Sequence, residues 1–467
     1  MKPRFLILAC LLSACATQSV ETPAMKHISK QFRYLPSSQK SNIYQWYSLF
    51  NDPTLTHLIE QGIEHNFTIQ AAQNRVLAAQ SYTKAIKADL LPSVGVSGNL
   101  GHQDISIDNP LKNNAILSPH LPSKITTDDG LVMLGFSASW EPDFFGQKTA
   151  DTDAVRFQSQ EAEYQTAYLK QAIAAKIAVE YFQISAHDAT MQLIDSHIKT
   201  LQELHRYAAS RFNAGQASKS DVLEIQTTIN KLIAQKTAVK ALRDEQEQQL
   251  AVLTGQSPQT FRLPENATAI NATLPIPAGF VPSDLLQLRP DILAKAAAVQ
   301  SSAAKVASAK ADLLPRFQLQ FLGETGKIGL STDGVHFSGT LFNAGVQIPI
   351  FTGGKIRHNI KGKEAELQAA MADYQQQVLN ALQEVDTAYN TRILLEKRLN
   401  ELQTAQKTAQ QRYTSTQRLF HNGYAQYNEV LRAKLDALQI EQEILTAKRD
   451  RVLSGVALYR ALGGKPQ

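Results

Sequence analysis

The feature that constrains this chain most is a stretch of sequence that it carries twice. The first copy spans residues 66–92 and the second spans residues 289–315, and both end in Ala-Asp-Leu-Leu-Pro at an offset of 223 residues. From Gly146 and Gly354 onward the two halves correspond at an offset of 208. An internal repeat of this length decides architecture before any local assignment does, so we expect one fold built twice.

Each copy is followed by two segments in which apolar and polar residues alternate. In the last of them Phe342, Ala344 and Val346 fall on one face, and Asn343 and Gln347 fall on the other. A length of about nine to eleven residues suits a transmembrane β-strand. One such segment alone fits a half-buried strand of a soluble sheet equally well, whereas four in matching positions favour a barrel. The predicted strands span residues 93–101, 132–140, 316–323 and 337–348.

Four strands are too few to close a barrel around a pore. An open sheet edge in lipid would leave backbone groups unpaired, at a cost of several kcal/mol each. The strands are therefore expected to be shared between copies of the chain. Three copies would give twelve strands, within the range of about 8 to 26 found in outer-membrane barrels, although this argument does not itself fix the number. The polar loops 102–131 and 324–337 would be the extracellular turns.

Two very long helices are predicted next, over residues 149–212 and 356–420, and neither contains a proline. Each would measure roughly 95 Å at 1.5 Å per residue. In the second, Val378, Val385 and Leu399 follow a seven-residue spacing, which is typical of a coiled-coil seam. Each long helix breaks at a glycine, Gly215 or Gly423, and returns as a shorter helix. The helices alone would also fit a soluble coiled-coil scaffold.

The N-terminus has the layout of a secretory signal. Lys2 and Arg4 precede a short apolar run that ends in Leu12-Ser13-Ala14-Cys15, which is too short to span a membrane as a helix. Small residues before a cysteine resemble the bacterial lipobox, and that resemblance implies cleavage before Cys15 and lipidation of its thiol. The alternative is an ordinary secretory peptide. A multi-chain lipid anchor gives stable membrane attachment, and Ala16 after the cysteine is compatible with sorting to the outer membrane.

Composition excludes several other classes of function. A net charge of +5 over 467 residues gives no concentrated basic patch of the kind that nucleic-acid binding requires. The two cysteines suit neither a disulfide framework nor a zinc site. The sequence contains no H-E-x-x-H motif, no P-loop and no nucleophile elbow. We therefore expect no enzymatic activity, no cofactor and no metal site, and the few Met, Cys and His residues argue against a soft-metal relay.

Taken together, these motifs resemble the TolC-like outer membrane factor family, in its lipoprotein efflux branch. The resemblance covers nearly all of the mature chain and depends on the order and double occurrence of its motifs. They are the lipobox at Cys15, Phe50 with Asp52-Pro53 and Leu55, both Leu-Leu-Pro signals, Arg289-Pro290-Asp291, both Phe/Gly junctions and both glycine tips.

The resemblance implies a homotrimer with a shared twelve-stranded barrel in the outer membrane of a Gram-negative bacterium and a helical tunnel through the periplasm. It also implies docking to a periplasmic membrane-fusion adaptor and to an inner-membrane pump, usually proton-driven. The expected function is passive conduction in a tripartite efflux pump, which is the setting of antibiotic resistance. Type I protein secretion and a non-conducting, lipid-anchored coiled-coil scaffold stay open as alternatives, and the sequence does not reveal the substrate.

The candidate gate residues lie beside the tip glycines. Asp221 matches an acidic tip residue of the family, and three copies would form a cation-attracting ring. Glu429 is its counterpart in the second repeat, Asp436 lies two turns further on, and Arg418 is expected to pair with one of these carboxylates. As exposed charges on a helix face they would contribute little.

Gly215 and Gly423 are expected to supply the backbone freedom for the turns on which adaptors would dock. The second tip departs from the family pattern, because Phe420 and Ala425 stand where a tyrosine and an arginine help to lock the gate. Any gate network in this chain must therefore be built differently.

The expected fold class is mainly α, with a β-barrel contribution from four strands per chain. The predicted plan is a signal peptide over residues 1–14, a lipid-anchored tether over 15–45, a first repeat over 46–258 with its tip at 213–220, a linker over 259–282, and a second repeat over 283–467 with its tip at 421–428.

Overall fold

The computed structural model describes residues 29, 31–34, 41–108, 124–329 and 335–463. The chain divides into two compact units. One, termed the sheet unit, contains Ala78–Ser159 and Ala298–Ala370. The other, termed the hairpin unit, contains the described residues of Pro23–Leu77, Gln160–Ala297 and Met371–Gln467. No helix in the described ranges is both long enough and apolar enough to cross a membrane.

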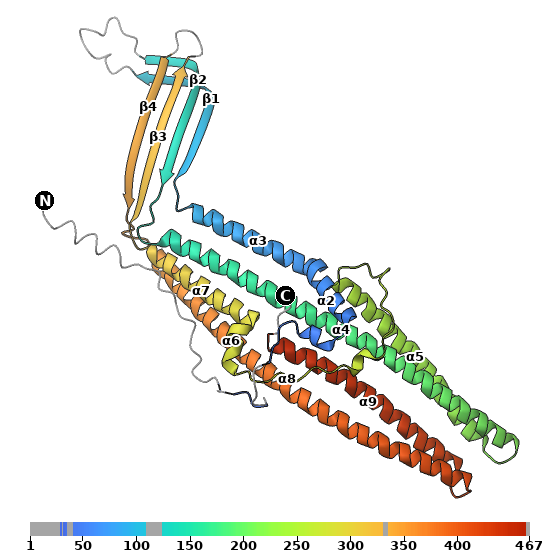
Figure 1. Cartoon of the computed structure of the whole chain (residues 1–467). Coiled ribbons are helices and arrows are strands. Elements are labelled where there is room, and N and C mark those ends of the chain that lie inside the picture. Colours follow the sequence, from blue (N-terminus) through green and yellow to red (C-terminus); the bar gives the residue numbers. More distant parts are fainter. Residues whose placement is uncertain (1–28, 30, 35–40, 109–123, 330–334, 464–467) are drawn as a thin grey trace, which may run out of the picture. The chain divides into compact units, whose positions relative to one another are not determined.

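The sheet unit is built on a single antiparallel sheet of four strands in the order β1-β2-β3-β4 (Figure 1). The register sets Val96 opposite Phe136, Ala138 opposite Phe321, and Phe321 opposite Phe342. Because residues directly opposite one another share a face, the apolar positions of all four strands gather on one side of the sheet. The strands are β1 (Ser93–Asp108), β2 (Lys124–Trp140), β3 (Arg316–Ile328) and β4 (Val335–Gln347).

The apolar face of this sheet is uncovered in the single chain. Val96 is 79% exposed, Leu100 is 79% exposed and Phe342 is 69% exposed. The opposite face carries Ser, Asn and Gln side chains, among them Gln318 and Gln320. One face therefore suits hydrocarbon and the other suits water, as the alternation in the sequence predicts.

The strands are longer than the alternating pattern predicts. β1 ends at Asp108 rather than at residue 101, and β2 begins at Lys124 rather than at 132. Backbone pairing needs a partner strand rather than an apolar face, so the ladder continues through polar positions such as Asp104 and Asp128, which lie opposite each other. The expected loops 102–131 and 324–337 shrink accordingly, and residues 109–123 and 330–334 lie outside the described part.

The helices repeat as the sequence does. α3 (Phe67–Ala88) and α7 (Pro290–Ala311) have 22 residues each, α4 (Gln147–Asn213) and α8 (Lys355–His421) have 67 each, and α5 (Lys219–Leu253) and α9 (Tyr427–Ala461) have 35 each. The two long helices thus extend one or two residues past each predicted end. The shorter elements are η1 (Trp46–Phe50), α2 (Pro53–His65), η4 (Ala269–Asn271), η5 (Pro282–Asp284) and α6 (Leu285–Leu288).

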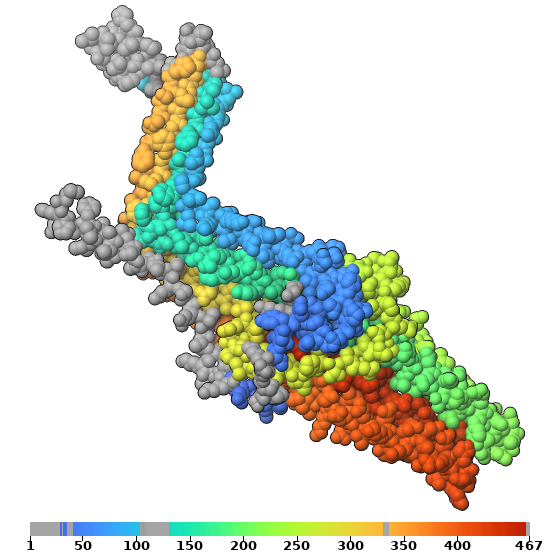
Figure 2. Space-filling view, in the orientation of Figure 1, coloured from blue at the N-terminus to red at the C-terminus, as the bar shows by residue number. Residues whose placement is uncertain are grey.

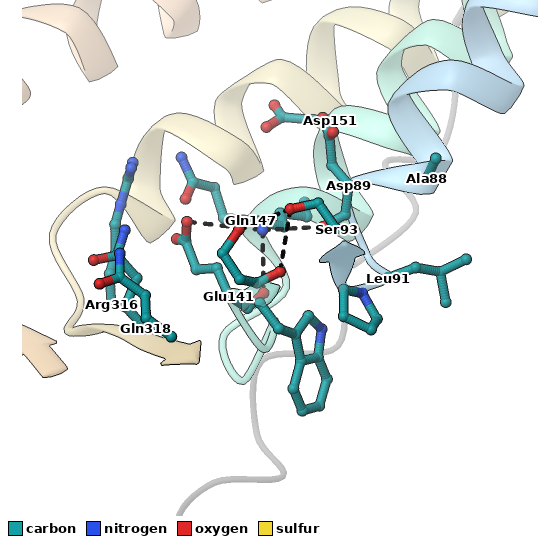
Figure 3. Close-up of a pocket in the computed structure, with 14 residues that line it drawn as sticks. Ala88, Asp89, Leu91, Ser93, Glu141, Gln147, Asp151, Arg316 and Gln318 are labelled. Atoms are coloured by element: carbon teal, nitrogen blue, oxygen red, sulfur yellow. Dashed lines mark hydrogen bonds and ion pairs between the residues drawn. The ribbon is translucent and has the colours of Figure 1, made fainter. Parts of the chain in front are cut away.

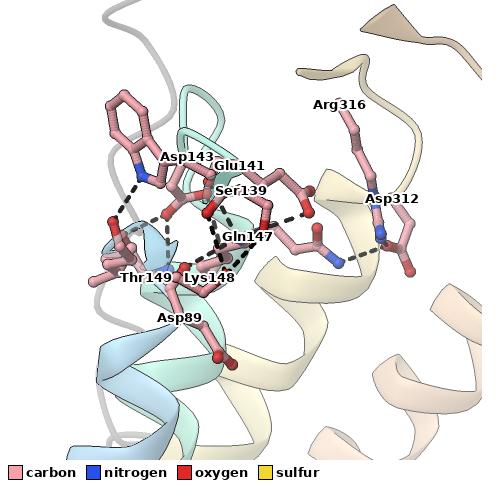
Figure 4. A network of polar contacts seen from close by, with 12 residues as sticks. Asp89, Ser139, Glu141, Asp143, Gln147, Lys148, Thr149, Asp312 and Arg316 are labelled. Carbon is pink, nitrogen blue, oxygen red and sulfur yellow. Dashed lines mark hydrogen bonds and ion pairs between the residues drawn. The ribbon is translucent and has the colours of Figure 1, made fainter. Parts of the chain in front are cut away.

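Polar contacts hold the strand ends against the helix ends within the sheet unit (Figure 4). The Lys148 ammonium donates to the backbone carbonyls of Asp89 and Glu141 at 3.0 and 3.1 Å. The Gln147 amide donates to the Asp312 carboxylate at 2.8 Å. The start of α4 is therefore tied to the ends of α3, β2 and α7.

Buried charges fasten the segment after α5 within the hairpin unit. Arg243 donates to Asp188 at 2.7 Å and to the Leu263 carbonyl at 2.9 Å, and the amide of Leu263 donates to Glu247 at 2.7 Å. Figure 2 shows this segment, in yellow-green, lying on the surface of the unit beside the blue residues of η1 and α2. The predicted linker therefore runs outside the helices, and its regular structure in the described residues is limited to short 3-10 turns.

Arg289 of the Arg-Pro-Asp motif is a second buried anchor, with its side chain 5% exposed. It donates two hydrogen bonds to Asp291, one to the carbonyl of Ala461 at 2.8 Å, and it pairs with Glu384 at 2.8 Å. Burial alone would lower the pKa of Arg289, but the two carboxylates outweigh it and raise that pKa. The motif therefore joins the start of α7 to the end of α9 and to the middle of α8.

Candidate functional site at the hairpin tips

The turns at the two hairpin tips have the same backbone geometry. Gly215 and Gly423 have φ values of +73° and +78°, in the region that disfavours every side chain. At the first tip the amide of Gly215 donates to the carbonyl of Phe212, and that of Gln216 donates to the carbonyl of Arg211. The second tip repeats both bonds at an offset of 208 residues. Each long helix thus ends in a Schellman turn that only glycine closes without strain.

Asp221 and Glu429 both cap the helix that follows their tip. The backbone amide of Ser218 donates to the Asp221 carboxylate at 3.3 Å, and the amide of Asp221 donates back to the Ser218 hydroxyl at 3.2 Å. In the second repeat the amide of Gln426 donates to Glu429 at 3.3 Å. Each carboxylate therefore has a structural role at a helix N-terminus, worth about 1 kcal/mol, besides any role in a pore.

Within one chain, Arg418 pairs with none of the three predicted carboxylates, Asp221, Glu429 and Asp436. Asp436 pairs with Arg412 instead, at 2.9 Å between two largely exposed side chains. The Arg418 side chain is exposed and makes no hydrogen bond or ion pair with the described residues. On α8, Arg412 lies nearly two turns before Arg418, so it is the residue that faces Asp436 across the α8–α9 hairpin.

An apolar cluster joins the two hairpins just behind the tips. Leu201 and Ala208 of α4, Ile225 and Ile229 of α5, and Tyr427 and Leu431 of α9 are all buried in it. The Tyr427 hydroxyl donates to the carbonyl of Leu204 at 2.8 Å, across the two hairpins. Burial raises the pKa of Tyr427, with Tyr207, Tyr413 and Asp221 adding to the effect, so this phenol stays protonated as a donor.

Aromatic rings close the cluster on its tip side. The rings of Tyr207, Phe420 and Tyr427 lie within 5.5 to 5.9 Å of one another. The guanidinium of Arg211 lies 5.2 Å from the centre of the Phe420 ring and donates to the Tyr207 hydroxyl at 3.3 Å. Phe420, which departs from the family pattern, thus interacts with a cation through its ring face rather than through a hydroxyl. We term Tyr207, Arg211, Phe420 and Tyr427 the tip cluster.

Sequence reasoning singled out Phe420 but missed the other three residues of the tip cluster. The repeat could not reveal them, because the residues 208 positions from Tyr207 and Tyr427 are Ser415 and Lys219. The available signal was the crowding of aromatic residues within a few turns of both glycines.

A polar contact also joins the hairpins farther from the tips. Nε2 of His197 on α4 lies 3.1 Å from Oε2 of Glu441 on α9, and the histidine side chain is only 6% exposed. Burial lowers the pKa of His197, although its hydrogen bond to Glu441 acts in the opposite direction. The contact is therefore a hydrogen bond of a neutral imidazole at neutral pH.

A cavity of about 770 Å³ lies in the sheet unit where strands meet helices (Figure 3). Its walls include Ser93, Ser139 and Gln318 of the polar sheet face together with Glu141 and Asp151. The cavity is open and polar, so it continues the hydrophilic side of the sheet. It does not resemble the enclosed, mainly apolar pockets that bind small molecules.

Two predictions from the sequence concern metal binding and lipidation. Among the described residues, no group of three or more His, Cys, Asp or Glu side chains could hold a metal ion. Cys15 and the signal sequence lie outside the described residues, so lipidation stays a prediction.

Comparison with known proteins identifies relatives along nearly the whole chain. The family model described as outer membrane efflux protein matches residues 58–256 and 281–464, one segment in each repeat. The solvent efflux pump outer membrane protein SrpC of Pseudomonas putida is 25% identical, over 89% of this chain and 86% of its own. The pyoverdine export outer membrane protein OpmQ of Pseudomonas aeruginosa is also 25% identical, over 99% and 97%.

A solved structure shares the same fold. The open state of the Neisseria gonorrhoeae MtrE outer membrane channel superposes with a TM-score of 0.81 at 22% identity, and covers 97% of this chain and 98% of that one.

Replacing Tyr427 by Phe should loosen the contact between the hairpins. Losing one hydrogen bond costs about 1 kcal/mol, which raises the equilibrium constant for local opening about fivefold. Amide hydrogen exchange around Leu204 and Ile225 should accelerate by that factor. The control is Tyr424→Phe, because Tyr424 is 82% exposed at the same tip. Equal exchange in the two variants would contradict a structural role for the Tyr427 hydroxyl.

Proposed function

The chain belongs to the outer membrane efflux protein family, and on that premise we propose that three copies form one channel fed by a periplasmic adaptor and an inner-membrane pump. As a family member the protein is the outer membrane channel of a tripartite efflux pump. The resemblance and the fold class expected from the sequence are thereby confirmed. The number of copies, the adaptor and the pump belong to the proposal.

The observation that carries the proposal is the state of the sheet edges. Within the described residues β1 and β4 each pair with a strand on one side only, while the apolar face of the sheet is exposed. In lipid the free edges would leave a row of unpaired N–H and C=O groups. Pairing β4 of one copy with β1 of the next satisfies both edges, and three copies close a twelve-stranded barrel.

The polar parts of the chain suit the wall of a water-filled path. The Ser, Asn and Gln face of the sheet would line the barrel, and the polar cavity beside Glu141 and Asp151 would lie on the same side. Substrates would pass along this wall without binding tightly, since the cavity beside Glu141 and Asp151 is open and polar. The two relatives are named for solvents and for pyoverdine, so we assign substrate choice to the pump rather than to the channel.

The hairpin tips would form the gate at the periplasmic end. The tip cluster and the Tyr427–Leu204 hydrogen bond hold the two hairpins of one chain together. Opening would be a switch between two packings of these hairpins, a kind of transition that packed helices support. The exposed residues of both turns, including Gly215 and Gly423, would offer the docking surface for the adaptor.

Two other functions compete with the proposed efflux channel. A non-conducting coiled-coil scaffold would not need an apolar sheet face, so the exposed side chains of β1 and β4 disfavour it. A channel for type I protein secretion would use the same fold with a different inner-membrane partner. The lipobox and the names of the relatives, which refer to efflux and export, favour the efflux assignment.

The decisive experiment combines native mass spectrometry with planar-bilayer conductance on one sample extracted from outer membranes in mild detergent. We expect a trimer that inserts and conducts, because only a closed set of edges is stable in lipid. A monomer or dimer that never conducts would eliminate the channel and leave the scaffold.

Asp221 is proposed to act as a ring of charge at the gate, and its capping role requires a careful choice of variant. Asp221→Asn keeps an oxygen that accepts the Ser218 amide and removes only the charge. If three carboxylates attract cations, this variant should lower the ratio of cation to anion permeability in single-channel recordings. Asp221→Ala removes both roles and should also widen the closed pore.

The matched control for Asp221 is Glu224→Gln, which changes an exposed carboxylate one turn further along α5. It should leave selectivity unchanged. If Asp221→Asn conducts with unaltered selectivity while Asp221→Ala unravels the start of α5, the carboxylate serves only as a cap. Unchanged conductance and antibiotic uptake in Asp221→Ala would rule out a gate role for this residue altogether.

Lipidation of Cys15 is proposed from the lipobox and from the position of the cysteine directly after Ser13-Ala14. Cys15→Ser should abolish labelling by palmitate analogues and stop processing at residue 15. Since a closed barrel holds itself in lipid, the variant should still reach trimers, at lower yield. Full labelling of the variant would show that the acyl chain sits elsewhere.

A further inference from the structure

The two junctions where a strand meets a long helix differ in charge although they occupy equivalent positions in the repeat. At the first junction the Asp143 carboxylate accepts from the amides of Lys148 and Thr149 at 3.1 and 2.8 Å, and so caps the first turn of α4. Figure 4 shows these contacts. The residue 208 positions later is Phe351. The second junction therefore lacks the carboxylate that caps the long helix at the first junction.

The second junction exposes two large apolar side chains almost completely, whereas Phe144 at the first is 54% exposed. Ile350 is 95% exposed and Phe351 is 91% exposed. They follow β4 directly, and Phe342 and Val346 on the apolar face of that strand are 69% and 57% exposed. The exposed apolar surface of the sheet thus continues past the end of β4 and up to the start of α8. Since family membership places the sheet in the outer membrane, this continuation would lie at the edge of the hydrocarbon layer.

Cations follow at once on the first two turns of α8. Lys355, Arg357 and Lys361 are all exposed, and the first turn contains no acidic residue. The nearest carboxylates along the helix, Glu364 and Glu366, are already paired with other lysines, each at 2.9 Å. Within the described part of the chain, the three cations make no side-chain hydrogen bond or ion pair. Positive charge near a helix N-terminus is unfavourable, and the described residues hold no carboxylate that is paired with these three cations.

We propose that Ile350, Phe351, Lys355, Arg357 and Lys361, termed the collar, bind anionic phospholipid of the periplasmic leaflet of the outer membrane. The two apolar side chains enter the boundary between headgroups and acyl chains, as the apolar residues of interfacial helices do. The three cations reach phosphate groups with their charged ends while their stems cover apolar surface. The inference rests on the proposed function only in that the sheet spans the membrane.

Charge favours lipid over a second copy of the chain as the occupant. A second copy would bring its β1 edge and the end of its α3 toward β4. That end of α3 carries Lys84 and Lys87 beside Asp89, so it offers no complementary negative surface. An anionic lipid supplies both the negative charge and the acyl chains that the collar requires.

The test titrates the purified full-length trimer in detergent with short-chain phosphatidylglycerol or phosphatidylethanolamine and counts bound lipid by native mass spectrometry. The unaltered protein should prefer phosphatidylglycerol. Arg357→Gln with Lys361→Gln should weaken phosphatidylglycerol binding by about fivefold for each cation removed and leave phosphatidylethanolamine binding unchanged. The matched control is Arg156→Gln at the first junction, where Arg156 is already paired with Asp153 at 3.0 Å. A double variant that loses no more than this control would overturn the proposal.

A second variant, Phe351→Asp, gives the second junction the residue of the first. If residue 351 faces water, the substitution should be tolerated or should stabilise the start of α8. If residue 351 belongs to the collar, the substitution should weaken binding of both lipids while the trimer persists. If the trimer dissociates in detergent without lipid, Phe351 seals a contact between copies and the collar is wrong. A conducting trimer without any preference for phosphatidylglycerol would overturn the collar alone, and an unaltered protein that forms no conducting trimer would refute the proposed function.

Discussion

Backbone hydrogen bonding at the two open sheet edges is the constraint on which the rest of the structure depends. An unpaired amide or carbonyl in hydrocarbon costs several kcal/mol, and β1 and β4 each present a row of them. No rearrangement of one chain removes this cost, because four strands cannot close on themselves. Identical chains must therefore associate for the sheet to insert into the membrane; association cannot simply follow insertion.

The repeat preserves backbone geometry and lets side chains diverge. The Schellman turns at Gly215 and Gly423 have the same two hydrogen bonds, and Asp221 and Glu429 cap equivalent helices. By contrast, Tyr207, Arg211 and Tyr427 of the tip cluster have no matching residue in the other half, and Asp143 is replaced by Phe351 at the second junction. Duplication thus supplies a symmetric frame, and the asymmetric side chains are the places where one half acquires a role that the other lacks.

The sequence predicted the parts of the fold that depend on hydrophobic periodicity and on the positions of glycine and proline. Alternation located four strands, and glycines located both turns. It underestimated the strands because pairing continues through polar residues such as Asp104, where no apolar face is needed. It missed the contact between Tyr427 and Leu204, which are 223 residues apart and belong to different hairpins. It also did not reveal that Arg412, rather than Arg418, pairs with Asp436 within one chain, since the helix phase at that contact is a tertiary property.

The distribution of contacts would let the proposed gate move while the barrel stays closed. Separating the hairpins near the tips breaks one hydrogen bond between them and exposes a small apolar cluster, a cost of a few kcal/mol by ordinary measures. Opening a sheet edge breaks a ladder of bonds that no solvent replaces in lipid. In the proposed channel, motion would therefore be confined to the water-exposed ends of the helices, where a docked partner would supply the required free energy through contacts that exist only in the open state.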